Sequence, residues 1–226
     1  MAAAGGLRVS GLGVAAGIEI VCVAAPCVLY ASVRGGVRAR LGLRRPPARA
    51  LLGAAIIGAS LWIVLLAAVM PLQESVAPTP PELKRALDLL AGAGEPLWLV
   101  VVAVALVPGV CEELLCRGIL LPAFSARRRA VGVMVSASLF ALLHLSPYRF
   151  VPTFLLGLSL GYVTVVAGSI VPAIVLHLVH NSAVLVSSRA EWSWVDEPSG
   201  WLGLAALAIC AVGHACVGFP ARAALR

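Results

Sequence analysis

The sequence predicts an all-α fold, a polytopic transmembrane helix bundle of about seven spans, and three observations carry this prediction. Of 226 residues, 61% are hydrophobic and only 12% are charged, and the mean hydropathy is +1.02. The apolar residues fall into seven stretches. Basic and acidic residues alternate between those stretches. Since a soluble domain carries roughly 25% charged residues, this composition excludes both a soluble globular domain and a disordered chain.

The seven apolar stretches define the predicted spans in chain order. A helix needs about 20 apolar residues to cross the hydrocarbon core. Two stretches, 131–146 and 150–167, are short for a span, so hydropathy defines their limits least well. The stretches cover residues 10–33, 50–71, 96–124, 131–146, 150–167, 169–187 and 200–219. A further segment, 80–94, fits either a short amphipathic helix on the outer surface or a solvated linker.

The loops between the spans predict the orientation. Residues 34–49 hold six arginines and residues 125–130 hold three, and neither segment contains an acid. With Arg222 and Arg226 in the tail, 11 of the 17 basic residues fall on one side. Because basic loops stay in the cytoplasm, we expect the N-terminus outside and the C-terminus in the cytoplasm. The positive charges follow the first apolar run, so we expect a retained first span rather than a cleaved signal peptide.

The net charge of +7 and the six cysteines have membrane explanations. The basic residues form short clusters between spans, which is typical of topology selection rather than of nucleic-acid binding. We therefore predict no nucleic-acid partner. The cysteines form no CxxC motif and lie almost entirely in apolar stretches, so we interpret them as small buried apolar residues.

The third span carries an unusual cluster of ionisable residues, Glu112, Glu113 and Arg117. Insertion of three such charges costs on the order of 8–10 kcal/mol, so we expect them to face the bundle interior or a wet cavity. Glu113 and Arg117 are four residues apart and can pair on one helix face. Two adjacent carboxylates in a poorly solvated site do not both ionise easily, which suits a general base or acid. Pro108 precedes the cluster and predicts a kink.

Two later spans supply histidines at helical spacing. Phe140 and His144 are four residues apart, and so are His177 and Asn181, so each pair lies on one helix face. Glu112 and His144 are each about 13 residues from the loop that joins their helices, which places both about 20 Å from it. The spacing thus favours a cluster of glutamates, histidines and an asparagine at intermediate depth in the membrane.

The ordered motifs EExxxR (Glu112, Glu113, Arg117), FxxxH (Phe140, His144) and HxxxN (His177, Asn181) resemble those of the CAAX-protease and bacteriocin-processing family. The resemblance covers about 96–187 and extends to myxosortase-like members. It implies three segments: 1–95 with the first spans and an outer loop, 96–187 as a catalytic helical core, and 188–226 with the last loop and span. Cys116 stands where the family pattern favours a bulkier residue.

The resemblance implies a glutamate-dependent intramembrane endopeptidase that needs no cofactor. Glu112 would activate a water molecule and His144 would help to orient or deprotonate it. His177 and Asn181 would stabilise the oxyanion, while Glu113, with Arg117 and Phe140, would support the site.

Other chemistries stay open. Zinc is an alternative, with Glu112, His144 and His177 as ligands, although no HExxH motif is present. A cysteine mechanism through Cys111 or Cys116 would leave the glutamates without a role. A non-enzymatic membrane protein or transporter with a proton-relay glutamate is an alternative of another class. Single histidines are otherwise explained by packing, which is our interpretation of His180. We interpret His214, near the cytoplasmic end of the last span, as interfacial, and Glu19 in the first span has no predicted partner.

The predicted partners are the lipid bilayer and a membrane-associated protein or peptide substrate, and the oligomeric state stays open. Members of this family process prenylated CAAX tails, peptides or C-terminal sorting anchors. The abundance of Ala, Gly, Val and Arg beside a single lysine is typical of a GC-rich bacterial genome, where prenylated tails are not expected. We therefore predict a protein of the bacterial inner membrane that cleaves a membrane anchor or a peptide.

Overall fold

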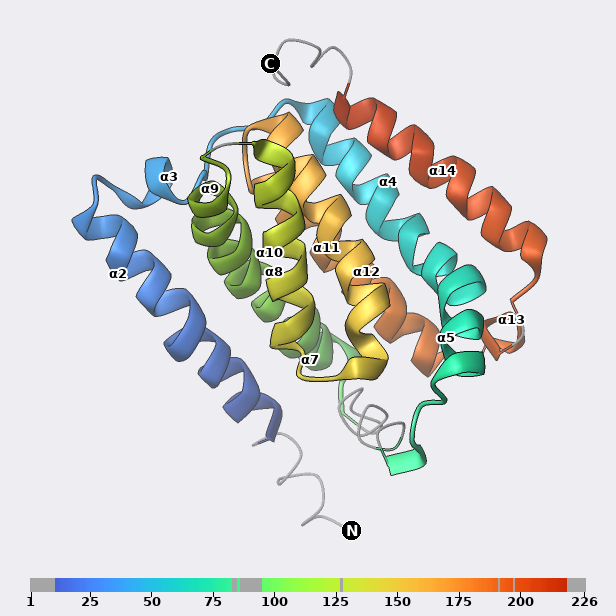
Figure 1. Ribbon diagram of the computed structural model, residues 1–226. Helices are drawn as coiled ribbons and strands as arrows, with labels where there is room; N and C mark the ends of the chain where they lie inside the picture. The colour runs from blue at the N-terminus through green and yellow to red at the C-terminus, as the bar shows by residue number, and fades with distance from the viewer. Residues whose placement is uncertain are drawn as a thin grey trace.

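The computed structural model describes residues 11–82, 85, 95–126, 128–190, 192–196 and 198–218. Within these ranges all regular structure is helical (Figure 1). Six helical segments are long and apolar enough to cross a membrane: Gly11–Val33, Ala48–Val76, Leu97–Phe124, α11 (Pro147–Ala167), α12 (Val171–Arg189) and α14 (Gly200–Gly218). With the shorter apolar helix α10 (Arg129–Leu143) they account for the seven predicted spans. The predicted polytopic helix bundle is confirmed, and the chain is an integral membrane protein.

Helix α10 is the shortest of the seven, and its neighbour is longer than hydropathy predicted. With 15 residues, α10 extends about 22 Å, less than the hydrocarbon thickness of about 30 Å. It ends at Leu143, so His144 is its C-cap residue. Helix α11 begins at Pro147 rather than near residue 150, because proline is favoured in the first helical turn and extends the helix past the polar residues Tyr148 and Arg149.

Three of the long segments contain π-helical turns, and each turn ends two residues before a proline. The first segment has η1 (Glu19–Ala24) before Pro26 in α2 (Ala25–Val33). The second runs through α4 (Ala48–Val64), η2 (Leu65–Val69) and α5 (Met70–Val76), with Pro71 after η2. Proline lacks an N–H and its ring crowds the carbonyl four residues earlier. A wider π turn at that point relieves the crowding without ending the helix.

The third segment repeats this pattern twice and carries the two glutamates. It consists of α7 (Leu97–Val100), η3 (Val101–Leu106), α8 (Val107–Glu113), η4 (Leu114–Leu120) and α9 (Leu121–Phe124). Pro108 follows η3 and Pro122 follows η4. At Pro108, where the sequence predicted a kink, the helix therefore continues through a π turn.

Small residues set how closely the helices pack. A Cβ atom on Gly53 would lie 2.6 Å from the Gly213 carbonyl oxygen, and one on Gly58 would lie 2.6 Å from that of Leu176. Helix α4 can therefore approach both α14 and α12 at backbone distance, as is typical of membrane helices. In Figure 1, α2 lies at one edge of the bundle and α14 at the opposite edge.

The basic loops share one end of the bundle. Helix α3 (Val37–Arg40), α9 and the last turn of α14 lie at the same end of the bundle (Figure 1). Helix α13 (Ser193–Asp196) and the turn between α10 and α11 lie at the other end. This arrangement agrees with the alternation of basic and acidic loops in the sequence. The tail arginines Arg222 and Arg226, and most of the predicted amphipathic segment 80–94, lie outside the described residues.

Candidate active site

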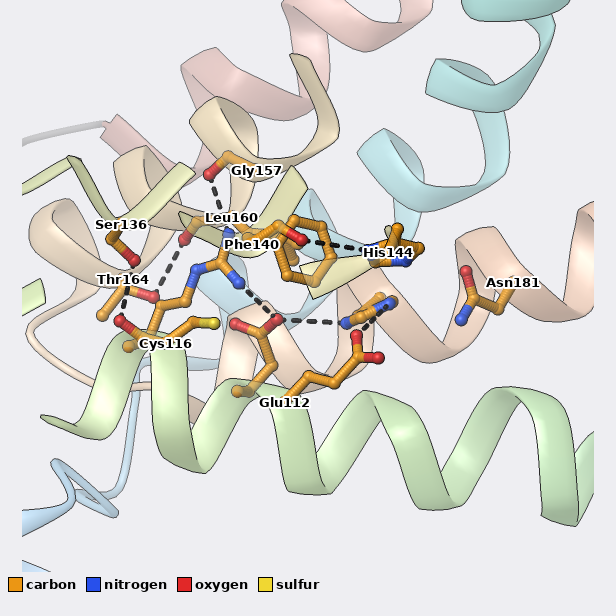
Figure 2. Close-up of polar contacts among 12 residues, drawn as sticks. Glu112, Cys116, Ser136, Phe140, His144, Gly157, Leu160, Thr164 and Asn181 are labelled. Atoms are coloured by element: carbon orange, nitrogen blue, oxygen red, sulfur yellow. Dashed lines mark hydrogen bonds and ion pairs between the residues drawn. The ribbon is translucent and has the colours of Figure 1, made fainter. Parts of the chain in front are cut away.

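The predicted site residues come from three helical segments that meet inside the bundle. The glutamates lie at the end of α8, Arg117 lies in η4, Phe140 and His144 lie at the end of α10, and His177 and Asn181 lie on α12. Figure 2 shows Glu112 facing the end of α10, with Asn181 set farther along α12.

Glu113 is the fixed centre of the cluster, and its side chain is fully buried. Its Oε1 atom accepts a hydrogen bond from Arg117 Nη1 at 2.9 Å and lies 3.0 Å from His177 Nδ1. The same Oε1 atom accepts from Arg117, and a carboxylate oxygen acts as an acceptor, so His177 Nδ1 is the donor in the second contact. That bond fixes the orientation of the imidazole ring and directs its Nε2 atom away from Glu113.

Arg117 is held on three sides, although its side chain is buried. Besides Glu113, it donates from Nη2 to the Gly157 carbonyl at 2.9 Å. Its Cζ atom also lies 4.6 Å from the centre of the Phe140 ring, a cation–π contact that strengthens when both groups are desolvated. The spacing EExxxR predicted the pairing with Glu113, but Gly157 was not predicted.

Gly157 reaches Arg117 because it lacks a side chain. A Cβ atom there would lie 3.0 Å from Ala137 Cα and 3.2 Å from Phe140 Cδ1. The absence of a side chain lets α11 pack closely against α10 and brings the Gly157 carbonyl to the guanidinium. No motif marks this glycine, so only the packed bundle reveals its role.

Glu112 occupies a different environment from Glu113. Its side chain is 19% exposed, and its Oε2 atom lies 3.7 Å from His177 Nε2. That oxygen has no hydrogen-bond partner among the described residues. His177 therefore lies between the two carboxylates, bonded to Glu113 through Nδ1 and facing Glu112 through Nε2.

Phe140 separates the two histidines. Its ring meets His144 edge-on at a centroid distance of 5.1 Å and His177 at 5.5 Å. His144 Nδ1 lies 2.9 Å from the Phe140 carbonyl oxygen. A carbonyl only accepts, so Nδ1 carries the proton, and in the neutral ring Nε2 is an acceptor. His144 is half-buried, which leaves this acceptor near the accessible side of the cluster.

Asn181 lies one turn beyond His177 and is engaged elsewhere. Its Nδ2 atom donates to the Val104 carbonyl at 3.4 Å. Val104 lies in the π-helical segment η3, just before Pro108. Asn181 thus joins α12 to η3, a structural contact that the HxxxN spacing did not predict.

The first helical segment contributes a third carboxylate that had no predicted partner. Segment η1 packs against α8, and Glu19 interacts electrostatically with His177 and Glu112.

His180 is buried, and its Nδ1 atom has no partner among the described residues. Cys116 is buried, and its carbonyl accepts from Ser136 Oγ at 2.7 Å, which joins η4 to α10.

Most of the cysteines are buried, as the sequence predicted. All six cysteines are free; four are buried, Cys216 is half-buried and Cys22 is exposed. Among the described residues, no three His, Cys, Asp or Glu side chains are grouped closely enough to hold a metal ion. Glu112, His144 and His177, the ligands of the zinc alternative, therefore form no such group in this structure.

The fold and the cluster define a class: a polytopic membrane protein with a carboxylate–histidine site built from several helices. Residues 94–183 match the family model described as type II CAAX prenyl endopeptidase Rce1-like. This match confirms the predicted resemblance to the CAAX-protease and bacteriocin-processing family and supports a protease at the level of the family. No curated protein and no solved structure matches the chain significantly. The matched segment contains every predicted site residue.

Proposed function

We propose that the chain is an intramembrane endopeptidase in which Glu112 activates a water molecule. The observation that carries this proposal is the asymmetry of the adjacent glutamates. Each carboxylate keeps an Oε2 atom without a hydrogen-bond partner among the described residues. Glu113, however, is fully buried and its Oε1 atom is committed to Arg117 and His177, whereas Glu112 is 19% exposed beside His177 Nε2. A general base needs a free oxygen within reach of the water molecule, and Glu112 is the more accessible of the two carboxylates.

In the proposed reaction, Glu112 removes a proton from water as the water oxygen attacks the peptide carbonyl carbon. His144 orients the same water through its Nε2 acceptor. The oxyanion of the tetrahedral intermediate is stabilised by two donors. One is His177, which in this step carries a proton on Nε2 as well as on Nδ1. The other is Asn181, which would exchange its bond to the Val104 carbonyl for one to the substrate. Glu112 then delivers the proton to the leaving nitrogen as the C–N bond breaks, which restores the ionised carboxylate.

The Glu113–Arg117 pair serves as the support of this site. It holds His177 by Nδ1, so that the imidazole cannot rotate away from Glu112. Phe140 packs against the guanidinium and both histidine rings, which fixes their separation. Preorganisation of this kind is how a site keeps reacting groups in place without reorganisation during the reaction.

The substrate in this proposal is a membrane-associated protein or peptide that is cut near its C-terminus or membrane anchor. The matched family model names CAAX prenyl endopeptidases, and a membrane-anchored tail is the shared feature of such substrates. We place the protein in the bacterial inner membrane with the N-terminus outside and the C-terminus in the cytoplasm, since the basic loops lie together at one end.

The test compares the C-termini of membrane proteins, by mass spectrometry, in native cells that carry the wild-type chain or Glu112→Gln. We expect specific proteins to keep uncleaved tails in the variant. His214→Ala is the matched control, because His214 lies on α14 and bonds the Cys210 carbonyl, away from the cluster. Identical C-termini in cells with equal amounts of both proteins would contradict proteolysis.

A further inference from the structure

A pocket of about 570 Å³ lies at the basic end of the bundle, and no histidine lines it among the described residues. Its walls come from the loop between α3 and α4, from η4 and α9, and from the turn between α11 and α12. Four arginines line it: Arg40, Arg44, Arg117 and Arg129. None of the described residues that line it is acidic.

The loop that carries Arg40 and Arg44 is fixed in place by distant parts of the chain. Ile170 N donates to the Gly42 carbonyl at 3.1 Å, and Ser169 Oγ donates to the Arg44 carbonyl at 2.6 Å. Gly42 has a φ of +69°, a conformation that favours glycine. Leu41 is completely buried against η4. The backbone that carries the two arginines is therefore held at the pocket by the fold, while their side chains are exposed and Arg40 Nε donates to the Arg34 carbonyl.

The deepest cation in the pocket has an unused donor. Arg117 is 2% exposed, and while its two Nη atoms bond Glu113 and Gly157, its Nε atom has no partner among the described residues. A buried N–H without a partner is costly. An anion in the pocket would supply an acceptor on this side of the guanidinium.

We propose that this pocket binds the phosphate group of an anionic ligand. Guanidinium groups match phosphate oxygens geometrically, and an anion in the pocket would reduce the repulsion among the cations that line it. The volume lies in the range of sites for small organic ligands, which leaves room for a phospholipid headgroup. The site also lies where the helices end, at the level of the headgroups, and basic pockets between membrane helices bind anionic lipids there.

The proposal does not rest on proteolysis, and it differs from simple topology selection by positive loops. Topology depends on the number of basic residues in a loop, whereas a phosphate site depends on which of them line the pocket. Arg38 and Arg45 belong to the same loop but do not line the pocket. They provide a control with the same change of charge.

The test measures lipid retention by native mass spectrometry of the full-length chain, delipidated in detergent and offered equal amounts of phosphatidylglycerol and phosphatidylcholine. We expect the wild type to prefer phosphatidylglycerol. The double variant Arg40→Gln/Arg44→Gln should lose about 30-fold of that preference, and Arg38→Gln/Arg45→Gln should keep it. An equal loss in both double variants, or no loss in either, would overturn the site.

A second arm needs no variant and identifies the source of the phosphate. Inorganic phosphate is added to the wild-type chain, with chloride at equal ionic strength as the reference, and both lipid retention and thermal stability are followed. Displacement of phosphatidylglycerol by phosphate supports a headgroup site. Stabilisation by phosphate without any lipid preference supports a site for the free ion. If neither phosphate nor phosphatidylglycerol has an effect beyond that of chloride and phosphatidylcholine, the proposal is wrong.

Discussion

Glu112 and Glu113 are neighbours in the sequence, yet the fold gives them opposite environments. Glu113 is fully buried, within 3.0 Å of both Arg117 and His177. Glu112 is 19% exposed, and its Oε2 atom lies 3.7 Å from His177 Nε2. Successive residues on a helix point about 100° apart, so the first can face an accessible side while the second faces the interior. We propose that this difference separates a reactive carboxylate from a supporting one.

The largest effect is expected from Glu112→Gln, which keeps the side chain's shape and removes the base. We expect cleavage by the purified protein to fall about 10³–10⁴-fold, at the upper end of what a general base contributes. Thermal stability should stay close to that of the wild type, because Glu112 makes only one long polar contact. Retained cleavage by this variant would remove Glu112 from the mechanism.

Variants of the Glu113–Arg117 pair should change the stability of the protein and not only its rate of cleavage. Arg117→Gln leaves Glu113 buried without its cation, and breaking one partner of a buried pair costs about 3–5 kcal/mol. We expect a large drop in the midpoint of thermal unfolding, measured in detergent. The double variant Arg117→Met/Glu113→Gln removes both charges and should recover part of the loss. Equal stability of Arg117→Gln and the wild type would show that the pair is not structural.

His144, like Glu112, is partly exposed, and its loss should affect cleavage more than stability. We expect His144→Ala to lower cleavage about 10²-fold with little change in unfolding temperature, because the helix ends at this residue and its ring is half-buried. His214→Ala is the matched histidine control and should change cleavage less than about twofold. Similar losses in both variants would point to a folding defect rather than to a role in the reaction.

The sequence predicted the helical class, the seven apolar segments and the pairing of Glu113 with Arg117, because hydropathy and helical spacing are local properties. It did not predict the contacts that depend on packing. Gly157 reaches Arg117 only because α11 lies against α10, and Asn181 reaches Val104 only because α12 packs against η3. Glu19 acquired neighbours when the first segment packed on α8. Such contacts join residues far apart in the chain, and no spacing rule encodes them.

The smallest expected effect separates the glutamate mechanism from its zinc alternative. With Glu113 bonded to His177 Nδ1 and the Phe140 carbonyl bonded to His144 Nδ1, each histidine keeps only Nε2 for another ligand. A zinc site would need both Nε2 atoms and a Glu112 oxygen at about 2.0–2.2 Å from one ion. Under the glutamate mechanism, cleavage by purified protein should change less than about twofold after prolonged treatment with a strong zinc chelator, whereas a zinc protease loses nearly all activity and regains it when zinc is added back. Metal analysis of the same samples completes the measurement: a stoichiometric loss of zinc that parallels the loss of cleavage would assign Glu112 to a metal instead of to the water molecule.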